Sequence, residues 1–127
     1  MKSKKKISLV IPILNEAPNL KKFIILLRLN LKKYFYEIIF VDDDSNDGSK
    51  QIILNYTDKR IRYILRKEKM KDLTKSCFLG INKSKFENIL IMDGDLQHNP
   101  KYLKKMLSEF FKDNYDFVIA IRDFDKK

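Results

Sequence analysis

Strand-like and helix-like segments alternate along the whole chain, and this alternation constrains the fold more than any other feature of the sequence. Short apolar runs rich in β-branched residues predict strands, and apolar residues at helical spacing predict amphipathic helices between them. The predicted strands are residues 7–13, 37–42, 61–65, 88–92 and 117–121. Several are continuous apolar runs, which is typical of strands covered by helices on both faces. We therefore expect an α/β fold with a doubly wound, mainly parallel sheet of about five strands.

The predicted helices lie at residues 20–31, 49–56 and 73–82, with a fourth that begins at Pro100. Asn99 is a favourable N-cap for this last helix, and Pro100 suits its first position. Because these apolar stripes are typical of core packing, we assign none of them to a ligand site.

The chain of 127 residues predicts a single domain that spans residues 1–127. Its single cysteine, Cys77, excludes an internal disulfide and indicates a reducing, cytoplasmic compartment. The lysine-rich start and the apolar run after it imitate a signal peptide, but Pro12 interrupts the run and Asn15-Glu16 follows it. No stretch reaches the roughly 20 apolar residues of a membrane span.

The formal net charge of +10 fits partners that carry phosphate: nucleic acid, anionic lipid headgroups or phosphate-bearing small molecules. The lysines are spread over helix faces and both ends of the chain, which fits a solvated surface or a membrane-facing surface. The lysines do not gather into one stripe flanked by aromatic residues, which is the pattern that would indicate a nucleic-acid partner.

Acidic residues gather at the ends of two predicted strands. Six of the 17 acids lie there: Asp42, Asp43, Asp44, Asp47, Asp93 and Asp95. In a doubly wound sheet both loops reach the carboxyl edge, where ligands bind. Like charges placed so close repel one another unless a cation compensates them, and hard oxygen ligands favour Mg²⁺ or Mn²⁺.

A purely structural interpretation competes with this one. Asp, Asn, Ser and Gly are common in turns and at N-caps, so either loop alone fits a turn. The two loops together, at the ends of the second and fourth predicted strands of one α/β pattern, favour a ligand site. Helix N-termini that follow both loops favour a bound pyrophosphate.

Three segments resemble the family-2 glycosyltransferases of GT-A fold. They are Val10-Ile11-Pro12 with Asn15-Glu16, then Val41-Asp42-Asp43 with Ser45 and Asp47-Gly48-Ser49, then Met92-Asp93-Gly94-Asp95-Leu96-Gln97-His98. The last is the most specific, and it is similar to the dolichyl-phosphate mannosyltransferase branch and its bacterial polyprenyl-phosphate relatives. The family also places a basic residue after the fifth strand, where Arg122 stands.

The resemblance implies a role for each matching residue. Pro12, Leu14 and Glu16 would line the nucleotide pocket, Val41 and Asp43 would contact the base, and Asp93 and Gly94 would lie against the ribose and phosphates. Asp95 and Gln97, with Asp93 beside them, would hold Mg²⁺ or Mn²⁺, and Arg122 would meet the phosphates. His98 fits a helix start as well as a ligand contact.

The resemblance also implies the reaction: an inverting transfer of a sugar from GDP-mannose or a UDP-sugar to a polyprenyl or dolichyl phosphate. We expect the chain to be the donor-binding part of a longer enzyme, at the cytoplasmic face of a membrane, and inactive alone. Two residues depart from the family pattern, since Asp44 and Asp72 stand where glycine is usual.

Three other functions remain open at this point. A sugar-phosphate nucleotidyltransferase favours a glycine-rich, basic loop after the first strand, where this chain has Asn15-Glu16-Ala17-Pro18. A metal-binding receiver domain needs an acceptor aspartate after the third strand, which here ends Leu65-Arg66-Lys67. A nucleic-acid binder rests on the net charge alone and leaves the acidic strand ends unexplained.

Overall fold

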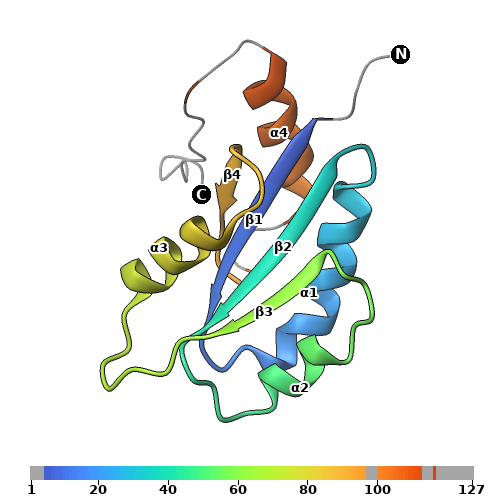
Figure 1. The fold of residues 1–127 in the computed structure, drawn as a ribbon. Coiled ribbons are helices and arrows are strands. Elements are labelled where there is room, and N and C mark those ends of the chain that lie inside the picture. The colour runs from blue at the N-terminus through green and yellow to red at the C-terminus, as the bar shows by residue number, and fades with distance from the viewer. Residues whose placement is uncertain (1–4, 97–99, 113–115, 117–127) are drawn as a thin grey trace, which may run out of the picture.

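The computed structural model describes residues 5–96, 100–112 and 116. Strands and helices alternate in this part of the chain as the sequence predicts (Figure 1). In chain order the elements are β1 (Lys6–Ile13), α1 (Ala17–Asn30), β2 (Phe35–Asp42), α2 (Ser49–Leu54), β3 (Ile61–Leu65), α3 (Leu73–Lys83), β4 (Ile89–Ile91), the 3-10 turn η1 (Pro100–Tyr102) and α4 (Leu103–Lys112).

The strands form one parallel sheet in the order β3-β2-β1-β4. The described residues contain four strands rather than about five, because the predicted strand at 117–121 lies outside them. Since β2 and β4 lie on opposite sides of β1, the strand order reverses at β1. A crevice for ligands is expected at the carboxyl ends of the strands at such a reversal.

Helices cover both faces of the sheet, as predicted: α1, α2 and α4 pack on one face and α3 on the other (Figure 1). Alternate residues of β1 divide between the two layers. Leu9 and Ile11 join the large core under α1, whereas Val10 joins a smaller cluster under α3. This two-sided burial explains why the strands read as continuous apolar runs.

The elements differ from their predicted bounds by a few residues. β2 begins at Phe35, whose N–H donates to the carbonyl of Lys5 and so extends the pairing with β1. α2 ends at Leu54 instead of residue 56. The fourth helix starts as a 3-10 turn at Pro100 and becomes α-helical at Leu103, while its expected N-cap, Asn99, lies outside the described residues.

Glycine brings α3 close to the sheet. A Cβ atom on Gly80 would lie 2.3 Å from Cγ1 of Val10 and 3.1 Å from Cγ2 of Val41. No other residue fits this approach unless the strands or the helix shift. The close packing fixes the height of α3 above the sheet, and therefore the height of its first turn above the carboxyl edge.

A buried carboxylate stabilises the opposite edge of the sheet. Glu37 accepts hydrogen bonds from the Ser8 hydroxyl and from Arg62 Nη1, each at 2.6 Å, and from the backbone N–H of Lys85. Burial disfavours the charged form, but these hydrogen bonds outweigh it and lower the pKa of Glu37 below 4.5. The network joins β1, β2 and β3 to the segment that leads into β4.

Candidate functional site

The two loops at the carboxyl ends of β1 and β2 are held together by hydrogen bonds. The N–H of Asn15 donates to the Ser45 hydroxyl at 2.8 Å, and the N–H of Asn46 donates back to the Asn15 side chain at 2.9 Å. The N–H of Ala17 donates to the Asp47 carboxylate at 3.0 Å. Because the first turn of α1 is fixed in this way, Glu16 has a defined position at the edge of the sheet.

A pocket of about 410 Å³ opens at this edge. Seven of the residues that we assigned to donor or metal binding line it: Pro12, Leu14, Glu16, Asp43, Asp93, Gly94 and Asp95. The β2 and β4 loops therefore meet at the same edge of the sheet, which confirms that part of the prediction. The individual roles of these residues remain predictions.

One described residue that we expected at the site, Val41, does not line the pocket. The Val41 side chain is completely buried and packs beneath α3, away from the pocket lining. The expected contact of Val41 with the base would therefore have to come from its backbone. Gln97, His98 and Arg122 lie outside the described residues.

The end of the β3–α3 connection and the first turn of α3 form a wall of the pocket that the sequence did not predict. Its contributors are Lys71, Asp72, Leu73 and Ser76. Asp72, which stands where the family pattern has glycine, is the N-cap of α3 and accepts a hydrogen bond from the N–H of Lys75 at 3.0 Å. The one sequence signal for this wall was that aspartate is a favoured N-cap residue, so Asp72 could start a helix at the edge of the sheet.

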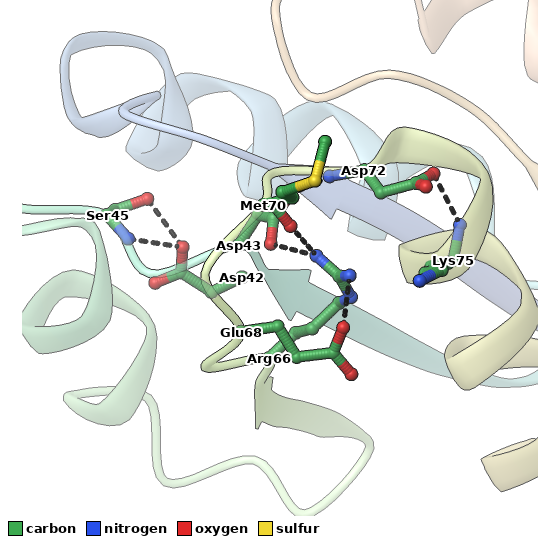
Figure 2. Close-up of polar contacts among 8 residues, drawn as sticks. All are labelled: Asp42, Asp43, Ser45, Arg66, Glu68, Met70, Asp72 and Lys75. Carbon is green, nitrogen blue, oxygen red and sulfur yellow. Dashed lines mark hydrogen bonds and ion pairs between the residues drawn. The ribbon is translucent and has the colours of Figure 1, made fainter.

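Asp43 is held by a buried ion pair (Figure 2). One carboxylate oxygen accepts from Arg66 Nη1 at 2.6 Å, and the other accepts from the N–H of Asp72 at 2.8 Å. Arg66 also donates to the carbonyl of Met70 and to the Glu68 carboxylate. Asp43 thus holds the β3–α3 segment against the pocket in addition to any contact with a base. One feature of the sequence indicates this role of Arg66. It is a basic residue directly after β3, and the neighbouring strand β2 is followed by acidic residues.

Five of the six clustered acids divide into two groups. Asp42 accepts from the N–H of Ser45 at 2.9 Å and from the Tyr63 hydroxyl at 2.6 Å, and Asp47 accepts from the N–H and hydroxyl of Ser49. Asp42 and Asp47 therefore serve turns and capping, as the structural interpretation proposed. Asp43, Asp93 and Asp95 line the pocket instead.

Two residues of the loop after β2 have left-handed backbone conformations. Asp44 has φ 64°, which explains why glycine suits this position in the family pattern. Gly48, which precedes α2, has φ 94°. Gly94 is required for a different reason, since a Cβ there would lie 2.9 Å from Cγ2 of Ile13. Gly94 therefore lets the chain after β4 pass directly over β1.

The pocket has a negative electrostatic environment. Burial raises the pKa of Glu16, and the charges of Asp95, Asp47 and Asp93 raise it further, while a hydrogen bond from Asn19 opposes them. Burial, followed by the charge of Asp93, also raises the pKa of the Cys77 thiol. Burial is the larger cause of both shifts. The added effect of Asp95 and Asp93 on Glu16 indicates that these carboxylates are close enough to repel one another, and a divalent cation relieves such repulsion.

The carboxylate oxygens of the pocket suit Mg²⁺ or Mn²⁺ that is bound together with a phosphate-bearing ligand. Among the described residues, no three histidine, cysteine, aspartate or glutamate side chains converge tightly enough to hold a metal by themselves. Magnesium sites at nucleotides usually use one or two carboxylates and take their other ligands from phosphates and water. Asp93 and Asp95 can supply that share.

A second hollow, of about 500 Å³, lies beside β4 and α4. Its lining is mostly apolar and includes none of the predicted site residues: Ile7, Glu87, Asn88, Ile89, Leu90, Ile91, Met106, Leu107, Phe110 and Asp116. Because none of the acidic strand-end residues line it, we place the candidate site at the carboxyl edge.

Comparisons with known proteins agree with the family resemblance. The sequence pattern of Glycosyl transferase family 2 matches residues 8–127. Dolichol-phosphate mannosyltransferase of Pyrococcus furiosus is 32% identical over 117 residues, which are 92% of this chain and 33% of that protein. The chain thus spans about a third of the length of this relative.

Solved structures share the fold. The mannosyltransferase PcManGT of Pyrobaculum calidifontis, in complex with GDP-Man and Mn²⁺, superposes with a TM-score of 0.69 at 17% identity, over 87% of this chain and 34% of that one. S. aureus TarS 1-349 in complex with UDP has a TM-score of 0.58 at 20% identity, over 71% of this chain and 27% of that one. Similarity at these identities establishes the fold, which is of GT-A type.

Proposed function

The chain belongs to glycosyl transferase family 2, and from this premise we propose that it forms the donor-binding part of a hexosyltransferase. The donor is a nucleoside-diphosphate sugar, and its hexose passes to an acceptor with inversion. The acceptor oxygen bonds to the anomeric carbon while the bond from that carbon to the diphosphate breaks. The electron pair of the broken bond leaves with the nucleoside diphosphate.

One observation supports this proposal above the others: carboxylates from three strand-end loops line a single pocket. Glu16, Asp43 and the pair Asp93 and Asp95 come from segments far apart in the sequence. They share the pocket with apolar Pro12 and Leu14. In the proposed arrangement Pro12, Leu14 and Glu16 line the nucleotide pocket and Asp43 contacts the base. Asp93 and Asp95 lie at the ribose and the diphosphate.

We propose that Asp95, Gln97 and Asp93 hold Mg²⁺ or Mn²⁺ when the donor binds. A bound metal would neutralise the negative charge that grows on the departing diphosphate. The protein's own residues fix the geometry: Gly94 sets the path of this loop over β1, and the Asp43–Arg66 pair fixes the facing wall. Burial is the main reason that the pKa of Glu16 is raised, and the charges of Asp95 and Asp93 raise it further; a cation held by these two aspartates would relieve that added repulsion.

The proposed donor is a GDP- or UDP-linked sugar, and the proposed acceptor is a polyprenyl or dolichyl phosphate. Support for the donor comes from the GDP-Man and UDP complexes of the structural neighbours, and support for the acceptor comes from the name of the archaeal relative. The phosphate oxygen of such a lipid would be the attacking nucleophile. We assign no residue of this chain to the acceptor.

The exposed face of α1 supports a position at the cytoplasmic face of a membrane. Ile25 and Leu29 lie one helical turn apart and are about half exposed, at 52% and 49%. Exposed Lys21 and Lys22 precede them, and exposed Lys32 follows the helix. Apolar side chains framed by lysines suit the surface of an anionic bilayer. None of the helices that the structure describes has the length and apolar character of a membrane span.

Calorimetric titration of the chain with GDP-mannose and with UDP-glucose tests the proposal. We expect at least one of them to bind in Mn²⁺ and to bind more weakly in EDTA. A random oligonucleotide at physiological salt is the control for simple charge attraction. Strongly salt-dependent binding to the oligonucleotide without binding of either sugar nucleotide would favour nucleic acid as the partner and contradict the proposal.

A further inference from the structure

The hydroxyl of Ser76 is a buried polar group without a hydrogen-bond partner. The residue is 1% exposed, and it lines the pocket at the carboxyl edge. In the part of the chain that the structure describes, every other buried side-chain nitrogen or oxygen has a partner. Buried polar groups in native proteins are nearly always satisfied, so an exception that lines a pocket indicates a ligand.

The position of Ser76 follows from the packing of α3. Ser76 and Gly80 are the buried residues of this helix, and Gly80 lies directly over Val10 of β1. Ser76 is one turn closer to the carboxyl edge, and Pro12, two residues beyond Val10, lines the pocket with it. Proline has no N–H group, so the strand at this point offers the Ser76 oxygen no donor.

The helix itself does not satisfy the hydroxyl. At the other end of α3 the Ser84 hydroxyl donates to the carbonyl of Gly80 at 2.9 Å, which is the usual local bond of a helical serine. The equivalent acceptor for Ser76 is the carbonyl of Asp72, which receives the backbone N–H of Ser76 at 3.1 Å and no bond from the hydroxyl. The Ser76 hydroxyl therefore remains available to a molecule in the pocket.

The surroundings of Ser76 identify the part of the donor that it contacts. The first turn of α3 is capped by the Asp72 carboxylate, and this negative group opposes a phosphate at the helix N-terminus. Pro12 and Leu73, which is exposed, are apolar residues that line the same pocket. A neutral hydroxyl beside apolar side chains suits a nucleoside, whose base and ribose carry neutral donors and acceptors.

We infer that the Ser76 hydroxyl is a binding contact for the nucleoside end of the donor, made by a wall of the pocket that the sequence did not reveal. This inference rests on the proposed function, because the nucleoside is that of the proposed donor. In the free protein the hydroxyl lowers stability, since it is desolvated without compensation, and the bound nucleoside supplies its missing hydrogen bond.

The test compares the wild-type chain with Ser76→Ala, and uses Ser84→Ala as the matched control. The ligands are GDP and UDP in Mn²⁺ and in EDTA, with Mn²⁺–pyrophosphate as a competitor that has no nucleoside. For whichever nucleotide binds the wild type, we expect Ser76→Ala to lower the affinity by about five- to tenfold, by the same factor with and without metal. Pyrophosphate affinity should not change.

Stability gives a second and independent measurement. Without ligand, Ser76→Ala should melt at the same temperature as the wild type or higher, because it removes an unsatisfied buried group. Ser84→Ala should melt lower and keep its nucleotide affinity, since its hydroxyl already has a partner.

Three results would overturn the inference. Unchanged nucleotide affinity in Ser76→Ala would remove Ser76 from the binding site and leave the proposed function intact. An equal loss of pyrophosphate affinity would move the contact from the nucleoside to the diphosphate. If the wild type binds neither GDP nor UDP, the proposed function fails and the assignment of Ser76 fails with it.

Discussion

Arg66 and Asp43 form an ion pair beneath the pocket, with 2.6 Å between Nη1 and Oδ1, although both side chains are almost completely buried. The pair joins the end of β3 to the loop after β2. The carboxylate of Asp43 also accepts the N–H of Asp72, so the same group fixes the start of α3. The carboxylate of Asp43 therefore connects the ends of β2 and β3 to the start of α3.

Replacement of Arg66 by methionine should destabilise the protein and weaken nucleotide binding together. The variant leaves the Asp43 carboxylate buried without its cation, and an uncompensated buried charge is strongly unfavourable. Melting temperature and GDP or UDP affinity are the measurements. The double variant Arg66→Met with Asp43→Asn should recover part of the lost stability.

Arg60→Met is the matched control for this pair. Arg60 also lies 2.8 Å from a carboxylate, that of Asp58, but its side chain is 51% exposed. Exposed ion pairs contribute about 0–1 kcal/mol, so this variant should melt close to the wild type. Equal losses in the Arg60 and Arg66 variants would contradict a special role for the buried pair.

Asp95→Asn should weaken nucleotide-diphosphate binding mainly in the presence of metal. Removal of an anionic ligand weakens the metal site, and we expect a loss of about tenfold or more in Mn²⁺ with a much smaller loss in EDTA. The folded state should tolerate the change, because one repulsive charge leaves the cluster around Glu16. If the variant instead melts earlier in EDTA and keeps its Mn²⁺-dependent affinity, Asp95 is a turn residue.

Glu37 should make the protein sensitive to acid. Its pKa is lowered in the folded state, so the stability that it contributes is fully present above the ordinary pKa of about 4.5. That contribution is lost as the pH falls from about 4.5 through the lowered folded value. Glu37→Gln should cost about 1–3 kcal/mol at neutral pH and should flatten the loss of stability below pH 4.5.

Urea unfolding between pH 3 and pH 7 measures this effect. Glu87→Gln removes the same charge from an exposed position in the segment that leads into β4, and serves as the control. If the Glu37 and Glu87 variants lose stability in parallel with the wild type as the pH falls, the buried network is not the source of the acid sensitivity.

Gly80→Ala should destabilise the protein by about 1–3 kcal/mol, because the added methyl group overlaps the buried side chain of Val10. Denaturant unfolding measures the loss. Val10→Ala in the same chain makes room for the methyl group, so the double variant should be more stable than the sum of the two single losses predicts. Strict additivity would contradict direct contact between these residues.

The sequence predicted the elements of the fold because their signals are local. Continuous apolar runs such as that in β1 reflect burial on both faces, and the stripe through Leu20 and Leu27 reflects the buried side of α1. Errors were confined to element ends, where a single hydrogen bond such as that from Phe35 to Lys5 decides the boundary.

The sequence also predicted most of the pocket, since parallel strands bring their carboxyl ends to one edge. Asp43 and Asp95 could be placed together before any coordinates were known. Their two neighbours Asp42 and Asp47 could not be separated from them, because an aspartate that caps a turn and one that lines a pocket have the same sequence signature.

The alternation of strand and helix patterns along the chain determined the fold class and the edge where ligands bind, since both follow from local pattern and from the handedness of the connections. Only the tertiary structure decided which groups are satisfied. Whether Asp43 meets Arg66 depends on how the ends of β2 and β3 come together. Whether Gly80 touches Val10 and whether the Ser76 hydroxyl finds a partner depend on how α3 packs on the sheet. These relationships join residues distant in the sequence, and packing to within a few tenths of an ångström sets them.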